Sequence, residues 1–122
     1  MNELYSSAPK TLIVSNNVVE ADDLTEMLTS QGLGPVVHTR DLEDAKSVLS
    51  KSADSLDLLL FGLSLHVREA TEFLLSVDVS ETSLVVIDGP LEFCEKEGAG
   101  VLLRPFSTSD VLAALKQLGL QN

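Results

Sequence analysis

The chain has 122 residues, of which 44% are hydrophobic and only 4% aromatic, and its formal net charge is −11. This length is typical of one domain with one core, which here must be built from aliphatic side chains. The excess of carboxylates argues against direct nucleic-acid binding and against an anionic membrane surface, because both present dense negative charge. From the length we expect a single domain over residues 10–122, and from the polar first residues a short N-terminal leader over residues 1–9.

Cysteine content and hydropathy predict a cytoplasmic protein. Cys94 is the only cysteine, so no intramolecular disulfide can form, which is typical of a reducing compartment. No apolar run approaches the ~20 residues of a membrane span. The first ten residues, MNELYSSAPK, also lack the apolar core of a signal peptide.

Short apolar runs recur along the chain and predict five strands. The runs are TLIVS at 11–15, VVHT at 36–39, LLLF at 58–61, LVVI at 84–87 and VLL at 101–103. Uninterrupted apolar runs of this length are typical of strands that are buried on both faces of a parallel sheet.

Between these runs, apolar residues recur at spacings of three and four and predict helices. The first stripe, in a helix at about 18–31, is Ala21, Leu24 and Leu28, and the second, after the expected N-cap Asp41, is Leu42, Ala45, Val48 and Leu49. The third stripe is Val67, Ala70, Phe73, Leu74 and Val77. The last is Val111, Leu112, Leu115 and Leu118, and it follows Ser107 and Asp110, which have capping-box spacing. Only PLEFCEKEGAG separates the last two runs, so the helix there is expected to be short, from Pro90 to Gly98. Strands that alternate with helices predict an α/β protein built from right-handed βαβ units.

Four segments resemble the strands of bacterial response-regulator receiver domains. They are TLIVSN at 11–16, DLLLFGLSLH at 57–66, LVVIDG at 84–89 and GAGVLLRPF at 98–106. The Pro105–Phe106 pair before a capped last helix is the most specific of these signs. The resemblance spans about residues 10–119 and implies a flavodoxin-like (βα)5 three-layer sandwich with strand order 2-1-3-4-5 and a shortened fourth helix.

At the positions where receivers carry out phosphorylation, this chain has other residues. The resemblance places the acceptor aspartate at Gly62, the acidic pair at Ser15 and Asn16, the phosphate-binding hydroxyl at Asp88 and the conserved lysine at Arg104. Neutral hydroxyl and amide groups are poor ligands for Mg²⁺, and glycine has no side chain to phosphorylate. We expect a degenerate phosphorylation pocket with no catalytic residue, no metal and no cofactor.

The role of Asp88 has two interpretations on the sequence alone. Its carboxylate could pair with Arg104 across the vacant site, in place of phosphate and lysine. Alternatively, Asp88 could close an Asx turn within the Asp-Gly-Pro sequence at 88–90.

Other polar residues carry weaker signals. Asp57 precedes the third strand, roughly 16 Å from the pocket at five residues' distance, so it is not a replacement acceptor. His38 and His66 match no metal motif, and Ser64 and Ser15 have no evident histidine base.

The receiver resemblance, together with its altered pocket positions, implies a phosphorylation-independent pseudo-receiver that acts as a protein-interaction or oligomerisation module in bacterial signalling or transcriptional regulation. Its partner is expected to be another protein, a second copy, or an output domain of a longer chain. A candidate interaction face comprises Leu91, Phe93, Leu102, Pro105 and Phe106, with core packing as the default for its apolar members. The alternative function is a small-molecule or nucleotide sensor that uses the vacated pocket.

Overall fold

The structure is a computed structural model that describes residues 8–52, 54–90 and 98–120. Its elements in chain order are β1 (Thr11–Val14), α1 (Val18–Ser30), β2 (Val36–Thr39), α2 (Leu42–Ser52), β3 (Leu58–Phe61), α3 (Arg68–Ser76), β4 (Ser83–Ile87), β5 (Ala99–Leu102) and α4 (Thr108–Gln117). The short helix expected between the fourth and fifth strands falls on residues 91–97, which lie outside the described residues.

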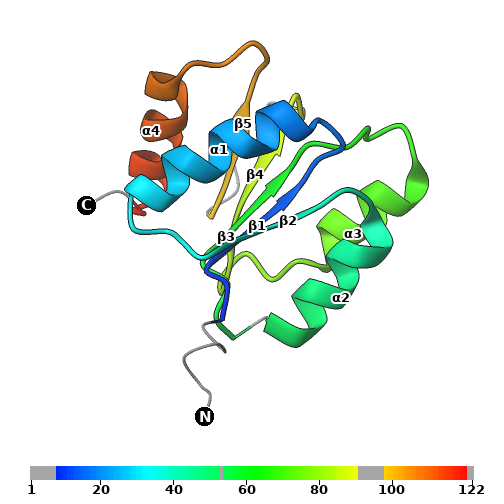
Figure 1. The fold of residues 1–122 in the computed structure, drawn as a ribbon. Helices are drawn as coiled ribbons and strands as arrows, with labels where there is room; N and C mark the ends of the chain where they lie inside the picture. Colours follow the sequence, from blue (N-terminus) through cyan, green and yellow to red (C-terminus); the bar gives the residue numbers. More distant parts are fainter. Residues whose placement is uncertain (1–7, 53, 91–97, 121–122) are drawn as a thin grey trace.

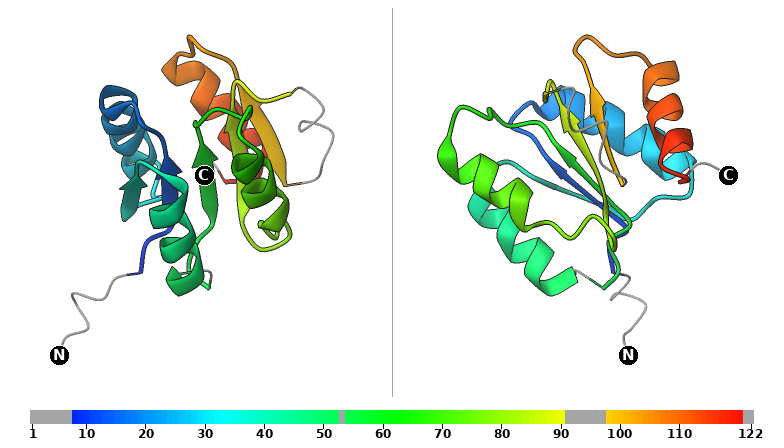
Figure 2. Two further views of the ribbon diagram at one scale, coloured as in Figure 1. Left: turned by 90° about the vertical axis from the view of Figure 1, so that its right-hand side faces the viewer. Right: turned by 180° about the vertical axis from the view of Figure 1, so that it is seen from behind.

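The five strands form one parallel sheet in the order β2-β1-β3-β4-β5. Helices α1 and α4 cover one face of this sheet, and α2 and α3 cover the other (Figure 1). The three layers are also clear when the molecule is turned (Figure 2). The predicted flavodoxin-like fold and strand order are therefore confirmed.

The strands are buried on both faces, as their uninterrupted apolar runs predict. In β1, Leu12 and Val14 pack in one core cluster with residues of α2 and α3, whereas Ile13 packs in the other with residues of α1 and α4. All three side chains have no exposed surface. Successive residues of a strand point to opposite faces, so one short strand supplies both cores.

Strand boundaries follow hydrogen-bonded pairing rather than apolarity, and here two predictions differ from the structure. The first strand ends at Val14, one residue before the predicted end. The last strand runs over Ala99–Leu102 instead of residues 101–103, because its four residues pair with Leu84–Ile87 of β4. Leu103, which was expected in the strand, is 55% exposed.

The helix N-caps predicted at Asp41 and Ser107 both form, and in each the side-chain oxygen accepts a backbone N–H of the following helix. The Asp44 N–H donates to Asp41 Oδ1 at 2.9 Å. Ser107 and Asp110 form a complete capping box at the start of α4. No helix in the described part of the chain is long and apolar enough to cross a membrane.

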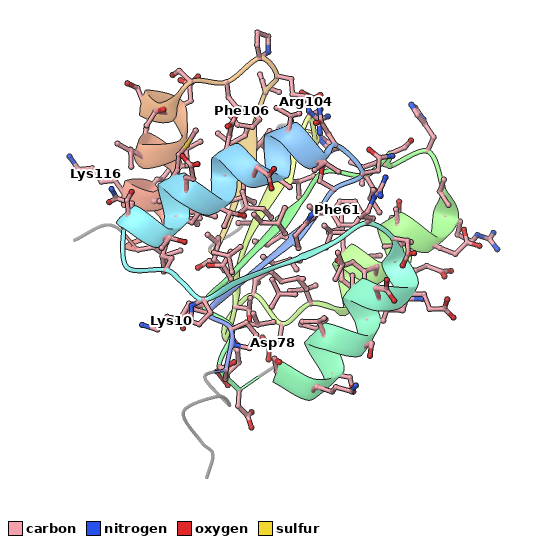
Figure 3. All side chains as sticks on the ribbon, viewed as in Figure 1. Lys10, Phe61, Asp78, Arg104, Phe106 and Lys116 are labelled. Atoms are coloured by element: carbon pink, nitrogen blue, oxygen red, sulfur yellow. The ribbon has the colours of Figure 1, made fainter. Side chains whose placement is uncertain are left out.

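Asp57 lies at the end of the sheet where the strands begin, opposite their carboxyl ends. Asp57 is exposed just before β3, where its N–H donates to the Lys10 carbonyl at 2.8 Å and its carbonyl accepts from the Ser83 N–H at 2.9 Å. Lys10 and Asp78 mark this end of the molecule in Figure 3, and Arg104 lies at the other. The predicted position of Asp57 away from the pocket is therefore confirmed.

Candidate functional site

The carboxyl ends of the strands meet at one edge of the sheet, where ligands collect in folds of this kind. This edge brings Asn16, Gly62, Asp88 and Arg104 together around a hollow of about 670 Å³. The fifth predicted pocket residue, Ser15, is fully buried just after β1 and does not line the hollow.

Arg104 is the centre of this edge, because its guanidinium bonds to three other segments of the chain. Its Nε and Nη2 donate to the two carboxylate oxygens of Glu20, at 2.7 and 2.8 Å. Its Nη1 donates to Asp88 Oδ2 at 3.1 Å, and Nη2 also donates to the Gly62 carbonyl at 3.3 Å. We call Glu20, Arg104 and Asp88 the arginine clamp.

Asp88 holds residue 104 through both of its carboxylate oxygens. Besides the ion pair through Oδ2, its Oδ1 accepts the Arg104 backbone N–H at 2.8 Å. Asp88 adopts a positive φ of 59°, a conformation that aspartate and asparagine tolerate better than most residues. Of the two interpretations of Asp88, the structure therefore has the ion pair with Arg104.

Glu20 is the site residue that the sequence reasoning missed. It lies in the first turn of α1, and its N–H donates to the side chain of the N-cap Asn17 at 3.1 Å. Asn17 and Glu20 have the three-residue spacing of a capping box, which was the available signal. That spacing predicts a return bond to the backbone of Asn17, whereas the carboxylate binds Arg104 instead.

Ser15 supports Glu20 rather than occupying a metal site. Its Oγ donates to Glu20 Oε1 at 3.3 Å and accepts the Asn17 N–H at 3.1 Å. The Ser15 carbonyl lies 2.6 Å from Nε2 of His38, so the His38 ring links β2 to the residue that follows β1. In the described residues, no three histidine, cysteine, aspartate or glutamate residues form a group that could hold a metal ion.

The electrostatics of the clamp favour a permanently charged arginine. The pKa of Arg104 is raised above its ordinary value, mainly by the hydrogen bond to Glu20, with further contributions from the charges of Glu20 and Asp88, while burial acts in the opposite direction. The Glu20 side chain is only 11% exposed and that of Asp88 is 46% exposed. One guanidinium thus serves two carboxylates, and this local excess of negative charge opposes the binding of phosphate.

Arg104 also takes up space beside the position that the resemblance assigns to a phosphate acceptor. A Cβ atom added to Gly62 would lie 3.2 Å from Nη2 of Arg104 and 3.3 Å from Cδ1 of Ile87. The Gly62 N–H donates to the Val14 carbonyl at 2.7 Å, which holds the backbone in place. A side chain at residue 62 therefore requires the ends of the Arg104 and Ile87 side chains to give way by a few tenths of an ångström.

Comparison with known proteins agrees with this architecture. No protein-family model matches the chain, and no curated protein matches its sequence. A solved structure of a CheY-like protein, TadZ from Pseudomonas aeruginosa, is similar over 98% of this chain and 94% of its own, with a TM-score of 0.61 and 23% sequence identity. The fold is CheY-like. At 23% identity, this similarity indicates a shared fold and nothing about function.

In this CheY-like fold, the residues of the candidate interaction face have different environments. Leu91 and Phe93 lie outside the described residues. Leu102 is only 4% exposed and packs in the core, so it presents almost no surface. Pro105 is exposed and Phe106 is half-buried, and both line a second hollow of about 530 Å³ beside α1.

Arg104 forms part of the wall of both hollows. On one side of it lies the hollow at the ends of β3 and β4, which also includes Ser64 and His66. On the other side lies the groove between α1 and the connection from β5 to α4. A change of the Arg104 side chain would therefore alter both hollows.

Proposed function

We propose that the protein is a phosphorylation-independent pseudo-receiver that serves as a protein-interaction or oligomerisation module in bacterial signal transduction or transcriptional regulation. The observation that carries this proposal is the arginine clamp, because its internal ion pairs engage the charged side chains at the edge of the sheet where receivers bind phosphate and metal. The proposal includes a cytoplasmic location and no enzymatic activity.

The chemistry of the pocket supports the loss of phosphotransfer. Glu20 and Asp88 are the carboxylates of the clamp, and both are already bonded to Arg104. A Mg²⁺ ion would have to compete with the guanidinium for these carboxylates, and Mg²⁺ gives up its own water ligands reluctantly. Gly62 offers no acceptor group, and Ser15 is committed to Glu20 and Asn17.

The test is incubation with acetyl phosphate and Mg²⁺, followed by intact-protein mass spectrometry. We expect no adduct of about 80 Da, the mass of one phosphoryl group, on the wild-type chain. The Gly62→Asp variant should also remain unmodified, because its new carboxylate meets Arg104 and no metal ligands accompany it. A receiver that is known to accept phosphate from acetyl phosphate is the positive control, and a stable adduct on the wild-type chain would refute the proposal.

The interaction role requires its own measurement. Size-exclusion chromatography with light scattering reports whether the protein self-associates, and affinity capture from the native organism reports other partners. In the proposed module, binding should be the same before and after treatment with acetyl phosphate. A partner whose affinity depends on that treatment would contradict a phosphorylation-independent role.

A second candidate function is small-molecule or nucleotide sensing. The hollow of about 670 Å³ favours it, because Asn16, Ser64 and His66 place polar groups around a space of ligand size. A thermal-shift screen with cyclic dinucleotides and metabolites tests this function. A ligand that stabilises the wild-type chain but not a Ser64→Ala/His66→Ala variant would favour the sensor over the docking module.

A further inference from the structure

We propose that the hollow at the carboxyl ends of β3 and β4 binds a small organic cation, in which an ammonium or guanidinium group is attached to an apolar body. We call this space of about 670 Å³ the strand-end hollow. The inference rests on the second candidate function, ligand sensing, and it names the chemical class of the ligand.

The charge of the strand-end hollow favours a cation over an anion. Asp88 and Arg104 both line it, and Glu20 binds the same guanidinium. Two carboxylates against one guanidinium leave an excess negative charge at this edge of the sheet, and the whole chain carries −11. A nucleotide or another phosphate ester therefore meets repulsion here, whereas an organic cation is attracted.

Asp88 is able to accept more hydrogen bonds than Arg104 gives it. Its Oδ1 accepts the Arg104 backbone N–H at 2.8 Å, and its Oδ2 accepts from Nη1 at 3.1 Å. A carboxylate has about four lone-pair positions, so about two remain beyond those that Arg104 uses. Because the Asp88 side chain is 46% exposed, these positions are accessible to the charged N–H groups of a ligand.

Neutral oxygen atoms beside Asp88 supply further acceptors. Ser64 and Asn16 are exposed and line the strand-end hollow. The Ser64 Oγ accepts the His66 N–H at 3.2 Å, and a hydroxyl oxygen has a second lone pair for a ligand. An ammonium group carries three N–H donors, which matches one carboxylate and two neutral oxygens.

The apolar part of the lining favours an organic cation over a metal ion. Leu63 and Leu65 are half-buried, Ile87 is buried and Pro90 is exposed, and all four line the strand-end hollow. Leu63 and Leu65 also pack against the core on the α2 and α3 side, which fixes their positions. An apolar ligand body would remove their remaining surface from water, as is typical of small-molecule sites.

The test compares three probes of nearly equal shape: phenylbutylamine, phenylbutanol and phenylbutanoate. At neutral pH they are cationic, neutral and anionic, since an alkyl amine titrates like lysine and a carboxylic acid like glutamate. Each is titrated into the ¹⁵N-labelled complete chain in about 0.15 M sodium chloride, which screens general attraction to an acidic protein. We expect phenylbutylamine to bind with a Kd in the low millimolar range, ordinary for a ligand of this size, and to shift residues 62–66 and 88–89.

Three variants change one property of the strand-end hollow at a time. Asp88→Asn removes the charge but keeps an oxygen for the Arg104 N–H and tolerates the positive φ, and it should weaken phenylbutylamine binding about three- to fivefold, the range of an exposed ion pair. Ser64→Asp adds a carboxylate and should strengthen binding about threefold. Leu65→Ala removes apolar surface and should weaken binding about threefold.

Matched controls make the same changes elsewhere. Asp78→Asn removes an exposed charge at the opposite end of the molecule (Figure 3). Ser50→Asp adds a carboxylate at an exposed position of α2, and Leu75→Ala truncates a leucine that is 68% exposed on α3. Each control should bind phenylbutylamine within about 1.5-fold of the wild-type chain, because solvent and salt screen distant charges.

Four outcomes would overturn the inference. They are the absence of shifts at about 20 mM phenylbutylamine, well above the expected Kd; shifts centred away from the strand-end hollow; binding of phenylbutanol or phenylbutanoate as tight as that of the amine; and equal effects of the variants and their controls.

The same titrations distinguish failure of this inference from failure of the functions on which it builds. An anionic or neutral ligand that binds the strand-end hollow would reject the organic cation and keep the sensor function. If the metabolite screen also yields no ligand of any charge, the sensor function falls with it. The acetyl phosphate experiment needs no ligand, so the pseudo-receiver proposal is tested independently of both.

Discussion

At the scale of single residues, Arg104 links parts of the chain that are far apart in sequence. It is 84 residues from Glu20 and 16 from Asp88. Its planar guanidinium donates hydrogen bonds in several fixed directions at once. A lysine ammonium also donates several hydrogen bonds, but its directions are less fixed. The same side chain therefore joins α1 and the ends of β3 and β4 in one internal network.

Removing the guanidinium should destabilise the fold. In Arg104→Met, the Glu20 carboxylate remains only 11% exposed but loses its charged partner. Because the Arg104 side chain is 36% exposed, solvent screens part of the effect, and we expect a loss of about 1–2 kcal/mol in the free energy of unfolding. Urea denaturation measures this loss.

Two further variants identify its source. Arg104→Lys keeps the charge without the bidentate geometry and should lose less stability than Arg104→Met. In a double-mutant cycle, Glu20→Gln and Arg104→Met should show a coupling of about 1 kcal/mol, since the two residues form one ion pair. Strictly additive losses would show that the clamp contributes nothing as a pair.

At the scale of secondary-structure elements, the helix start next to the site is set by local side-chain bonds. Ser107 Oγ accepts the Asp110 N–H at 3.2 Å, and Asp110 Oδ2 accepts the Ser107 N–H at 2.9 Å. This capping box fixes where α4 begins, and Val111 and Leu115 of the helix are buried in the core. The cap thereby also fixes the connection that carries Pro105 and Phe106.

Loss of this cap should weaken the whole domain. We expect Ser107→Ala to lower the free energy of unfolding by about 1 kcal/mol, because the first turn of α4 loses a partner for a backbone N–H. Thr108→Ala, at an exposed residue one position further on, is the control and should change stability by less than about 0.5 kcal/mol. Equal losses in the two variants, measured by urea denaturation, would contradict a specific role of the cap.

At the scale of the whole molecule, repulsion among carboxylates opposes the attraction within the clamp. The chain has 19 acidic and 8 basic residues, so repulsion between like charges should dominate the long-range electrostatics. Salt screens exposed charges over about 8 Å at physiological ionic strength and over shorter distances at higher concentrations.

We therefore expect sodium chloride to stabilise the protein. Between about 0.02 and 0.5 M, the free energy of unfolding should rise by at least about 0.5 kcal/mol. The rise should be larger in Arg104→Met, where no clamp remains to be weakened by screening. Stability that falls with salt in the wild-type chain would mean that attractive pairs outweigh the net charge.

The sequence by itself determined the order of the elements, because apolar runs and helical stripes depend only on local spacing. Asp41 and Ser107 were predictable caps, since each bonds to a backbone N–H within its own first turn. The placement of Gly62 at the pocket followed from the resemblance in the third strand. These features lie within short segments and needed no knowledge of packing.

Only the tertiary structure decided which side chains pair with one another at the pocket. Glu20 has the spacing of a local capping residue, yet its carboxylate bonds to a guanidinium 84 residues away because α1 packs beside the end of β5. The limits of β5 likewise depend on pairing with β4 rather than on its own apolarity. Long-range contacts of this kind arise when parallel strands align their carboxyl ends at one edge of the sheet, and no local pattern encodes which side chains meet there.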